Sequence, residues 1–353
     1  MDKVRVGIVG SKFAASFHAD SYVRDNRVEI VAVAAIDGLE EFSKEWNVPD
    51  TYEDYNEMLA RDDIDLISVC VPNFLHHDVT IAAAKAGKHI VCEKPLATTS
   101  ADGEEMVKAC KDAGVKLFYA EDWVFAPALN RALEIVAEGG IGKALYLKAR
   151  ETHNGSHSPF AKKKSTCGGG CLIHLAIHPV GFALYMLGGP DNPAVEVTAL
   201  TTGGLDKNYV HKDFEGEDWS VGIIKFADGR TALIEGNYIT VGGMDDVIDI
   251  YGAEGRITVN LTFGSCLDVY SRKGIGYAIE KTDFTHGWTK PAVDEFFNLG
   301  YVEELRYFVD CVINDRQPKY GVDAATGLAT IQVIEAMYKS AEEGKTIKLG
   351  ARD

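Results

Sequence analysis

Cys92-Glu93-Lys94-Pro95 closes a run from Asp65 to Leu96 in which two short apolar strands bracket a helix. This pattern is typical of an open α/β sheet, in which ligands bind outside the carboxyl ends of the strands. The second strand therefore delivers Lys94 to the place where a nucleotide and its substrate would meet. We interpret Lys94 as a candidate proton-transfer group, with an ordinary surface lysine at a strand end as the alternative.

A glycine turn follows the first apolar strand, which spans residues 4–9. The next segment, 13–22, has helical spacing and no proline, so we expect a helix whose unpaired backbone N–H groups form an anion site. The usual glycine fingerprint is altered, because Lys12 stands at its second glycine position and Ala15 at its third. Lys12 either neutralises a pyrophosphate or points to solvent. The expected cofactor contacts of this turn are Gly10, Ser11, Lys12, Phe13 and Ala14.

Asp37 ends a second β-rich run, 28–36. A carboxylate at this place, a few tens of residues after the glycines, can accept hydrogen bonds from an adenosine ribose. The residues that follow, 38–41, include no lysine or arginine that would hold a 2′-phosphate. The sequence therefore favours NAD over NADP, although Asp-Gly is also a common turn pair.

Several further motifs occur in a fixed order along the chain: a Pro72-Asn73-x-x-His76 turn, a Gly87-Lys88-His89 segment before a strand, Glu93-Lys94-Pro95, glycines at 168–170 and a closing segment at 335–345. In this order the motifs resemble those of the Gfo/Idh/MocA family, which includes glucose-fructose oxidoreductase and inositol dehydrogenase. The resemblance covers nearly the whole chain. It implies an α/β protein with an N-terminal Rossmann-type doubly wound parallel sheet. It also implies cofactor contacts at Pro72, Asn73, His76, Glu93 and Lys94.

Composition narrows the class of protein further. The 353 residues exceed the usual single core, so two domains are expected. A formal net charge of -17 argues against nucleic acid or an anionic membrane as partner. No apolar run approaches the roughly 20 residues of a membrane span, and no signal peptide precedes the first strand. Seven cysteines in core-like segments indicate reduced thiols and a cytoplasmic location.

We place the domain boundary after the last strand of the alternating pattern, 116–120. Residues 1–122 are expected to form the dinucleotide-binding domain, and residues 123–353 a substrate-binding and oligomerisation domain of the α+β class. The second domain begins near a helix at 127–138 and continues with strands joined by tight turns, which indicates a large, mainly antiparallel open sheet. The resemblance implies that the free face of this sheet forms a dimer or tetramer interface. The predicted strands are 145–152, 195–202, 220–226, 231–239, 247–251 and 256–260, and helices at 301–314 and 323–343 complete the domain.

A single helix is predicted from 171 to 185, with Cys171, His174 and His178 on one face. In the resembled family this helix usually carries an aspartate and, four residues later, a histidine that flank the substrate hydroxyl. Here His178 matches that histidine, but His174 replaces the aspartate. The division of proton transfer between Lys94, His174 and His178 therefore stays open. We expect Lys94 and His178 to move protons and His174 to orient the substrate.

Two more segments are candidates for substrate binding. The polar loop after the strand 145–152 carries His153 and His157 and suits a polyhydroxylated ligand. Trp123 lies just past the last strand of the first domain, where its ring suits either a sugar or the core. Val124 stands where many family members have an arginine, which disfavours an anionic substrate.

The same cysteines and histidines are also potential zinc ligands. A structural zinc needs four converging ligands, and three residues along two helical turns cannot easily reach one ion. We therefore expect no metal, although adjacent pairs among these residues keep the alternative open. The residues concerned are Cys167, Cys171, His174 and His178, with Glu151, His153 and His157 as possible additions.

These features predict an NAD-dependent dehydrogenase that oxidises a secondary hydroxyl of a sugar, glycoside or polyol. Such a reaction needs a base within hydrogen-bond reach of the hydroxyl proton. Two alternatives remain, both found in the resembled fold. One is a glycosidase that works through transient oxidation and retains NAD. The other is a non-catalytic regulator that senses NAD or a sugar, which loss of the catalytic lysine and histidine would favour; both residues are present.

Overall fold

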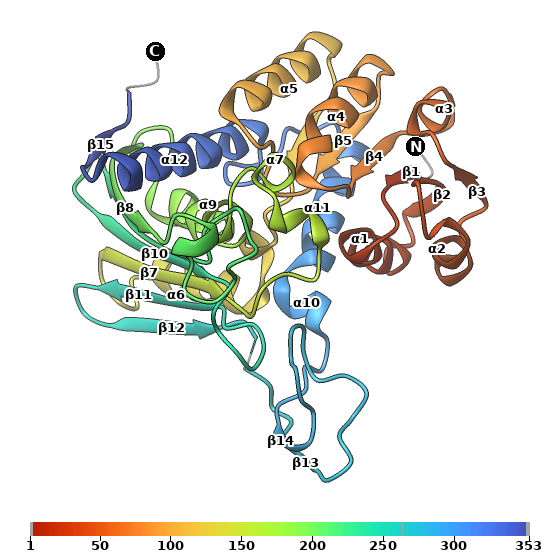
Figure 1. Cartoon of the computed structure of the whole chain (residues 1–353). Helices are drawn as coiled ribbons and strands as arrows, with labels where there is room; N and C mark the ends of the chain where they lie inside the picture. The colour runs from red at the N-terminus through yellow and green to blue at the C-terminus, as the bar shows by residue number, and fades with distance from the viewer. Residues whose placement is uncertain (1–2, 263, 351–353) are drawn as a thin grey trace. The chain divides into compact units, whose positions relative to one another are not determined.

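The computed structural model describes residues 3–262 and 264–350 of the chain. It consists of two compact units (Figure 1). The first unit takes in the chain up to Phe125 together with Gly300–Ile331, and the second takes in Ala126–Leu299 together with the chain from Gln332 onward. Each unit has its own sheet and is described separately below.

The first unit contains a six-stranded sheet in the order β3-β2-β1-β4-β5-β6. All of its strand pairs are parallel. This order is that of a dinucleotide-binding doubly wound fold, with its switch point between β1 and β4. The predicted Rossmann-type sheet is thus confirmed. The strands are β1 (Val4–Val9), β2 (Val28–Ala34), β3 (Asp50–Tyr52), β4 (Leu66–Val69), β5 (His89–Cys92) and β6 (Leu117–Tyr119).

Helices cover this sheet because its central strands are largely apolar. Strand β4 is buried at all four of its positions, as expected for a strand covered on both faces. The helices of the unit are α1 (Phe13–Val23), α2 (Leu39–Trp46), α3 (Tyr55–Leu59), α4 (His76–Lys85), α5 (Ser100–Ala113) and α11 (Tyr301–Ile313), and the short 3-10 helices are η1 (Asn73–Leu75) and η2 (Asp122–Phe125).

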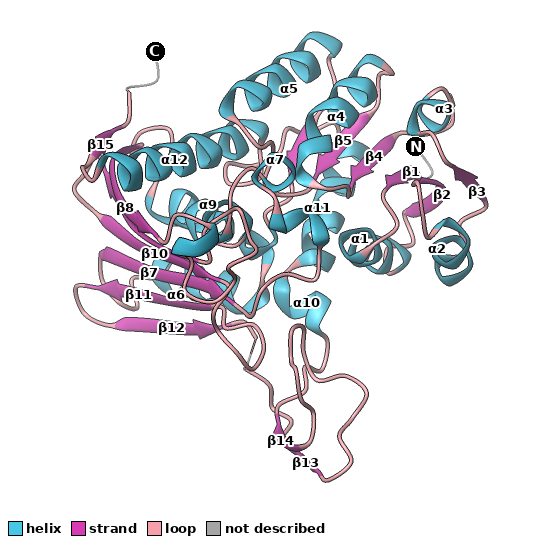
Figure 2. Ribbon diagram, in the orientation of Figure 1, coloured by secondary structure: helices cyan, strands magenta, loops and turns pink. Residues whose placement is uncertain are grey.

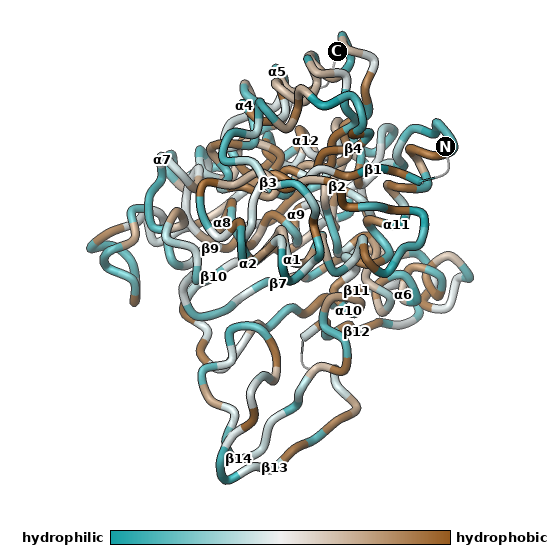
Figure 3. The backbone as a smooth tube through the Cα atoms, turned by 90° about the vertical axis from the view of Figure 1, so that its right-hand side faces the viewer, coloured by the Kyte–Doolittle hydropathy of each residue, from teal (hydrophilic) through white to brown (hydrophobic). Residues whose placement is uncertain are grey.

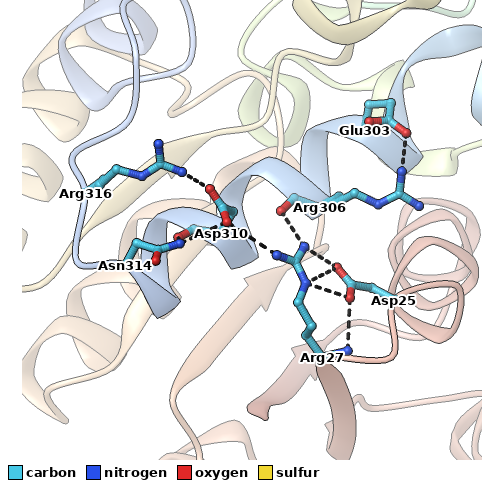
Figure 4. A network of polar contacts seen from close by, with 7 residues as sticks. All are labelled: Asp25, Arg27, Glu303, Arg306, Asp310, Asn314 and Arg316. Carbon is cyan, nitrogen blue, oxygen red and sulfur yellow. Dashed lines mark hydrogen bonds and ion pairs between the residues drawn. The ribbon is translucent and has the colours of Figure 1, made fainter. Parts of the chain in front are cut away.

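Helix α11 belongs to the first unit, whereas the sequence placed it in the second domain. The ring of Tyr301 packs edge-on against that of Phe17 in α1, with centroids 4.8 Å apart. The guanidinium of Arg27 donates to Asp25 and reaches Asp310 on α11, as Figure 4 shows. These contacts join the start of the chain to its last third. Local sequence pattern cannot reveal such a pairing, because it depends on which distant face the helix meets.

The second unit contains a seven-stranded sheet in the order β12-β11-β7-β10-β9-β8-β15 (Figure 2). The predicted mainly antiparallel sheet is confirmed, with one parallel pair between β7 and β10. Helices α8 and α9 pack against β7, β9 and β10. The strands are β7 (Ala144–Thr152), β8 (Ala194–Thr201), β9 (Trp219–Phe226), β10 (Thr231–Asn237), β11 (Val247–Gly252), β12 (Arg256–Asn260) and β15 (Ile347–Lys348).

A two-stranded hairpin in the second unit was not expected from the sequence. It pairs β13 (Val269–Ser271) with β14 (Gly287–Thr289) and lies apart from the seven-stranded sheet in Figure 3. The remaining helices of the unit are α6 (Pro127–Ala137), α7 (Lys164–Cys167), α8 (Cys171–His174), α9 (Ile177–Leu187) and α10 (Glu295–Leu299), with η3 (Pro159–Lys162) and η4 (Leu205–Lys207); α12 (Ala324–Glu343) runs through the boundary of the two units.

Within the described residues, no single helix is long and apolar enough to cross a membrane. One bent pair of helical segments, 164–174 and 177–187, is long and apolar enough when the two are taken together.

Candidate active site

The glycine turn after β1 fits a dinucleotide. Gly10 has a φ of 122°, and a Cβ atom there would lie 2.2 Å from the carbonyl oxygen of Cys70, so glycine is required. Helix α1 begins directly after Lys12, whose side chain makes no capping hydrogen bond. The turn therefore combines close backbone approach with a helix N-terminus, which is what a pyrophosphate needs.

Lys12 lies beside Asp37 in the structure. Its Nζ is 3.2 Å from Asp37 Oδ2, and Ser11 Oγ donates to the Asp37 carbonyl at 2.6 Å. Both charged side chains are about two-thirds exposed, at 66% and 64%. Since Asp37 follows β2, Lys12 lies beside the expected ribose position, and its large exposure agrees with the alternative in which it points to solvent.

The Pro72-Asn73 turn and His76 connect β4 to the Glu-Lys-Pro segment. Asn73 is buried in η1, and His76 is buried at the start of α4. The His76 ring lies between two backbone carbonyls, with Nδ1 2.7 Å from Pro95 O and Nε2 2.9 Å from Val71 O. Burial lowers the pKa of His76. In this structure His76 joins two backbone segments, and only 1% of its surface is exposed.

Lys94 stands on a buried network formed by α1, β4 and the end of β5. Glu93 Oε1 lies 2.9 Å from His18 Nε2, and Glu93 Oε2 accepts the backbone N–H of Lys94 at 3.1 Å. His18 Nδ1 in turn lies 3.1 Å from Ser68 Oγ. Burial alone would raise the pKa of Glu93, but the His18 hydrogen bond and nearby charges lower it below its ordinary value. The Glu93 side chain is therefore an ionised carboxylate that fixes the backbone of Lys94.

More carboxyl groups surround Lys94 and Glu93. Glu121, Asp122 and Glu304 are all at most 4% exposed. Burial raises the pKa of Asp122 to about 7, an effect that Lys94 opposes and Glu93 reinforces. Burial, reinforced by the nearby Asp122, Glu93 and Glu121, raises the pKa of Glu304 well above its ordinary value.

Sequence reasoning missed His18 and Glu304. No motif marked either residue, since an isolated histidine on α1 and a glutamate on α11 have no local signature. Their apolar surroundings were the only available signal. A charged residue inside an otherwise buried helical face is a reason to look for a partner.

In the second unit, His174 and His178 do not lie on one continuous helix. Helix α8 ends at His174 and α9 begins at Ile177, with a bend of 51° between the flanking segments. The predicted helix from 171 to 185 is therefore wrong. The Cys171 thiol fixes α8 on the sheet, because its Sγ donates to the carbonyl of Gly236 at 3.1 Å. Helix α9 is buried along most of its own length and packs independently of this contact.

The two histidines have different partners. His174 Nδ1 lies 2.5 Å from the hydroxyl of Tyr238, which follows β10. His178 Nε2 lies 3.8 Å from Glu151 Oε2 on β7, and both side chains are only 5% exposed. A carboxylate from the sheet thus lies near His178, although the helix carries none.

Two models of one protein family match most of the chain. Residues 4–121 match the model of an oxidoreductase family with an NAD-binding Rossmann fold, and residues 134–349 match its C-terminal alpha/beta domain. The chain belongs to the Gfo/Idh/MocA family. It is an oxidoreductase with an NAD-binding domain.

Named Gfo/Idh/MocA proteins resemble the chain over most of its length. It is 26% identical over 98% of both chains to myo-inositol 2-dehydrogenase of Thermotoga maritima. It is 27% identical over 74% of both chains to levoglucosan dehydrogenase of Pseudarthrobacter phenanthrenivorans. Among solved structures, GenD2 from gentamicin A biosynthesis in complex with NAD superposes with a TM-score of 0.90, at 27% identity over 99% of this chain and 97% of that chain.

The other predicted substrate residues differ in accessibility. His153 is buried, with its ring 5.7 Å from that of Tyr238, whereas His157 is exposed near Lys281. Burial and the Lys281 charge lower the pKa of His157. Trp123 in η2 is 1% exposed, so its ring packs as a core residue in this structure.

The cysteines of the zinc alternative serve the packing of the second unit. Both Cys167 and Cys171 are buried, and burial raises the pKa of the Cys171 thiol well above its ordinary value. Within residues 3–262 and 264–350, no group of three or more mutually close ligand atoms includes Cys167, Cys171, His153, His157 or His174. The expectation that the chain binds no metal stays a prediction.

Proposed function

We propose that this protein is an NAD-dependent dehydrogenase that oxidises a secondary hydroxyl of a sugar, glycoside or polyol. The observation that carries the proposal is that both proton-transfer groups are present in organised surroundings. Lys94 is fixed by the buried Glu93 and His18, and His178 faces the buried Glu151. The named relatives that act on inositol, levoglucosan and D-glucosides support the substrate class.

Residues 1–122 would hold the cofactor and residues 123–353 would hold the substrate. Gly10, Ser11, Lys12, Phe13 and Ala14 would contact the pyrophosphate and Asp37 the adenosine ribose. Bound NAD would supply the acceptor for the hydride that leaves the substrate carbon. The chain itself would take up the hydroxyl proton at the amine of Lys94 or the imidazole of His178. Val124, which is fully buried, leaves a neutral substrate preferred over an anionic one.

A homo-oligomer would form through the open face of the second unit's sheet. Leu200 and Ile223 on this face are 59% and 49% exposed, which is unusual for large apolar side chains on adjacent strands. We also propose a cytoplasmic location. Six of the seven cysteines are buried free thiols and only Cys266 is exposed, as expected in a reducing compartment.

A panel of neutral sugars, glycosides and polyols, assayed for NADH absorbance, tests the proposed function. Before the assay, a separate sample of the protein is denatured and its supernatant is checked for tightly held nucleotide. Reduction of added NAD with at least one substrate is the expected result. Hydrolysis of a glycoside without net NADH formation would instead establish the NAD-retaining glycosidase. Binding of NAD and sugar without any turnover would establish the regulator.

A further inference from the structure

Strand β7 carries an acid where its pattern requires an apolar residue. Leu147 and Ala149 point toward the helix-covered face and are 0% and 1% exposed. Glu151 continues this row and is 4% exposed. The alternate residue Arg150 points to the other face, where it pairs with Asp245 at 2.9 Å. A buried carboxylate in an apolar row costs free energy unless a partner stabilises it, so its position calls for a functional explanation.

The partner of Glu151 is His178 on α9, which packs directly on β7. The 3.8 Å separation of Nε2 and Oε2 is that of an ion pair rather than a direct hydrogen bond. His174 cannot act in the same way, because it carries no negative charge and its Nδ1 already faces the Tyr238 hydroxyl. His153 from the end of β7 also packs on the Tyr238 ring. Within this unit, Glu151 thus brings a carboxylate to 3.8 Å from the His178 ring.

We propose that Glu151 is a positioning residue for the dehydrogenase reaction, in which it stabilises the cationic form of His178 that arises when the substrate hydroxyl gives up its proton. The O–H bond of the substrate breaks, an N–H bond forms on His178, and the new positive charge faces the Glu151 carboxylate. This deepens the proposed function and rests on it. It also explains how the site tolerates a histidine at position 174, since the required carboxylate comes from the sheet instead of the helix.

The test replaces Glu151 by glutamine, which keeps the shape and removes the charge. Loss of the charge makes His178 a weaker base, so the midpoint of its titration should fall by about one pH unit. The midpoint is followed by NMR of histidine-labelled protein, with His178→Asn used to assign the resonance. The acid limb of the kcat/KM profile should move to lower pH by a similar amount, and kcat should fall about 10- to 100-fold.

Glu235→Gln is the matched control, because Glu235 lies on the neighbouring strand β10 at a half-buried position of the opposite face. This variant should leave both the titration and the pH profile unchanged. If Glu151→Gln does not fold, Glu151→Asp retains the charge at a greater distance and should lower the midpoint by a smaller amount.

An unchanged His178 midpoint in Glu151→Gln or Glu151→Asp would overturn the pairing. A lower rate with an unmoved acid limb would also overturn it, because a purely structural role predicts that result. The absence of turnover in the parent protein would overturn the proposed function and the catalytic role of Glu151 with it. The NMR titration would still report the pairing in that case, so the two failures can be told apart.

Discussion

The ion pair between Lys12 and Asp37 makes cofactor preference the most direct quantity to test. Replacing Asp37 by alanine removes the proposed acceptor of the adenosine ribose hydroxyls and leaves Lys12 without its anionic neighbour. A hydrogen bond to a charged group contributes about 1.5 to 3 kcal/mol, so NAD affinity should fall roughly 10- to 100-fold. The same carboxylate repels a 2′-phosphate, so NADP should not suffer this loss.

Lys12 determines whether Asp37→Ala also binds NADP more tightly than the parent protein does. Both side chains of the pair are mostly exposed, so an interaction of the released Lys12 with a 2′-phosphate should contribute at most about 1 kcal/mol. This corresponds to roughly a fivefold gain in NADP affinity. The ratio of NADP to NAD affinity should therefore change by about 50- to 500-fold in Asp37→Ala, and the gain should decrease with rising salt.

Fluorescence titrations with NADH and NADPH measure both affinities without turnover. The double variant Asp37→Ala with Lys12→Ala separates the two contributions. It should keep the NAD loss but lose the NADP gain. An equal loss of both nucleotides in Asp37→Ala would refute the reasoning, because the ribose would then be held elsewhere. An unchanged NADP gain in the double variant would remove Lys12 from it.

Three further predictions concern the proton-carrying groups. Lys94→Ala should lower turnover about 10² to 10⁴-fold and leave NAD binding within a few-fold, as judged by steady-state kinetics and nucleotide titration; unchanged turnover would exclude Lys94. Because the raised pKa of Asp122, about 7 against 3.8, makes the folded state bind a proton more tightly than the unfolded state, stability should be lost as pH rises from about 4 to about 7. Asp122→Asn should remove that loss, which amounts to up to about 4 kcal/mol when the free energies of urea unfolding at pH 4 and pH 8 are compared. The exposed Asp112→Asn is the control and should keep the loss seen in the parent protein. His174→Asn should keep measurable activity while His178→Asn loses most of it across the pH range, and stoichiometric zinc or manganese in elemental analysis, lost with His174, would reverse that forecast.

The parallel sheet of the first unit could be predicted because its signals are local. The glycine turn, the apolar strands and the helix starts each lie within about ten residues of one another, and alternation of strands and helices then dictates a parallel sheet. The order of the strands was not predicted, and neither were β3 and the helices α2, α3 and α5. Helix α11 could not be placed in the same way, because its packing against α1 depends on contacts between opposite ends of the chain.

The second unit was predictable in its sheet but not in its chemistry. The apolar period gave the strands, yet it continued across Leu175 and Ala176, where the helix breaks, because both residues are buried on either side of the bend. The same limit left Glu151, whose carboxylate faces His178, out of the predicted proton-transfer groups. A search along the helix finds His174 in the aspartate position and concludes that the acid is missing. Only the packing of β7 against α9 brings Glu151 to within 3.8 Å of the imidazole, although η3, α7 and α8 lie between these two elements in the chain. Substitution at a catalytic position is therefore better judged by charge within reach of the base than by residue identity, since a carboxylate can act on His178 from whichever element supplies it.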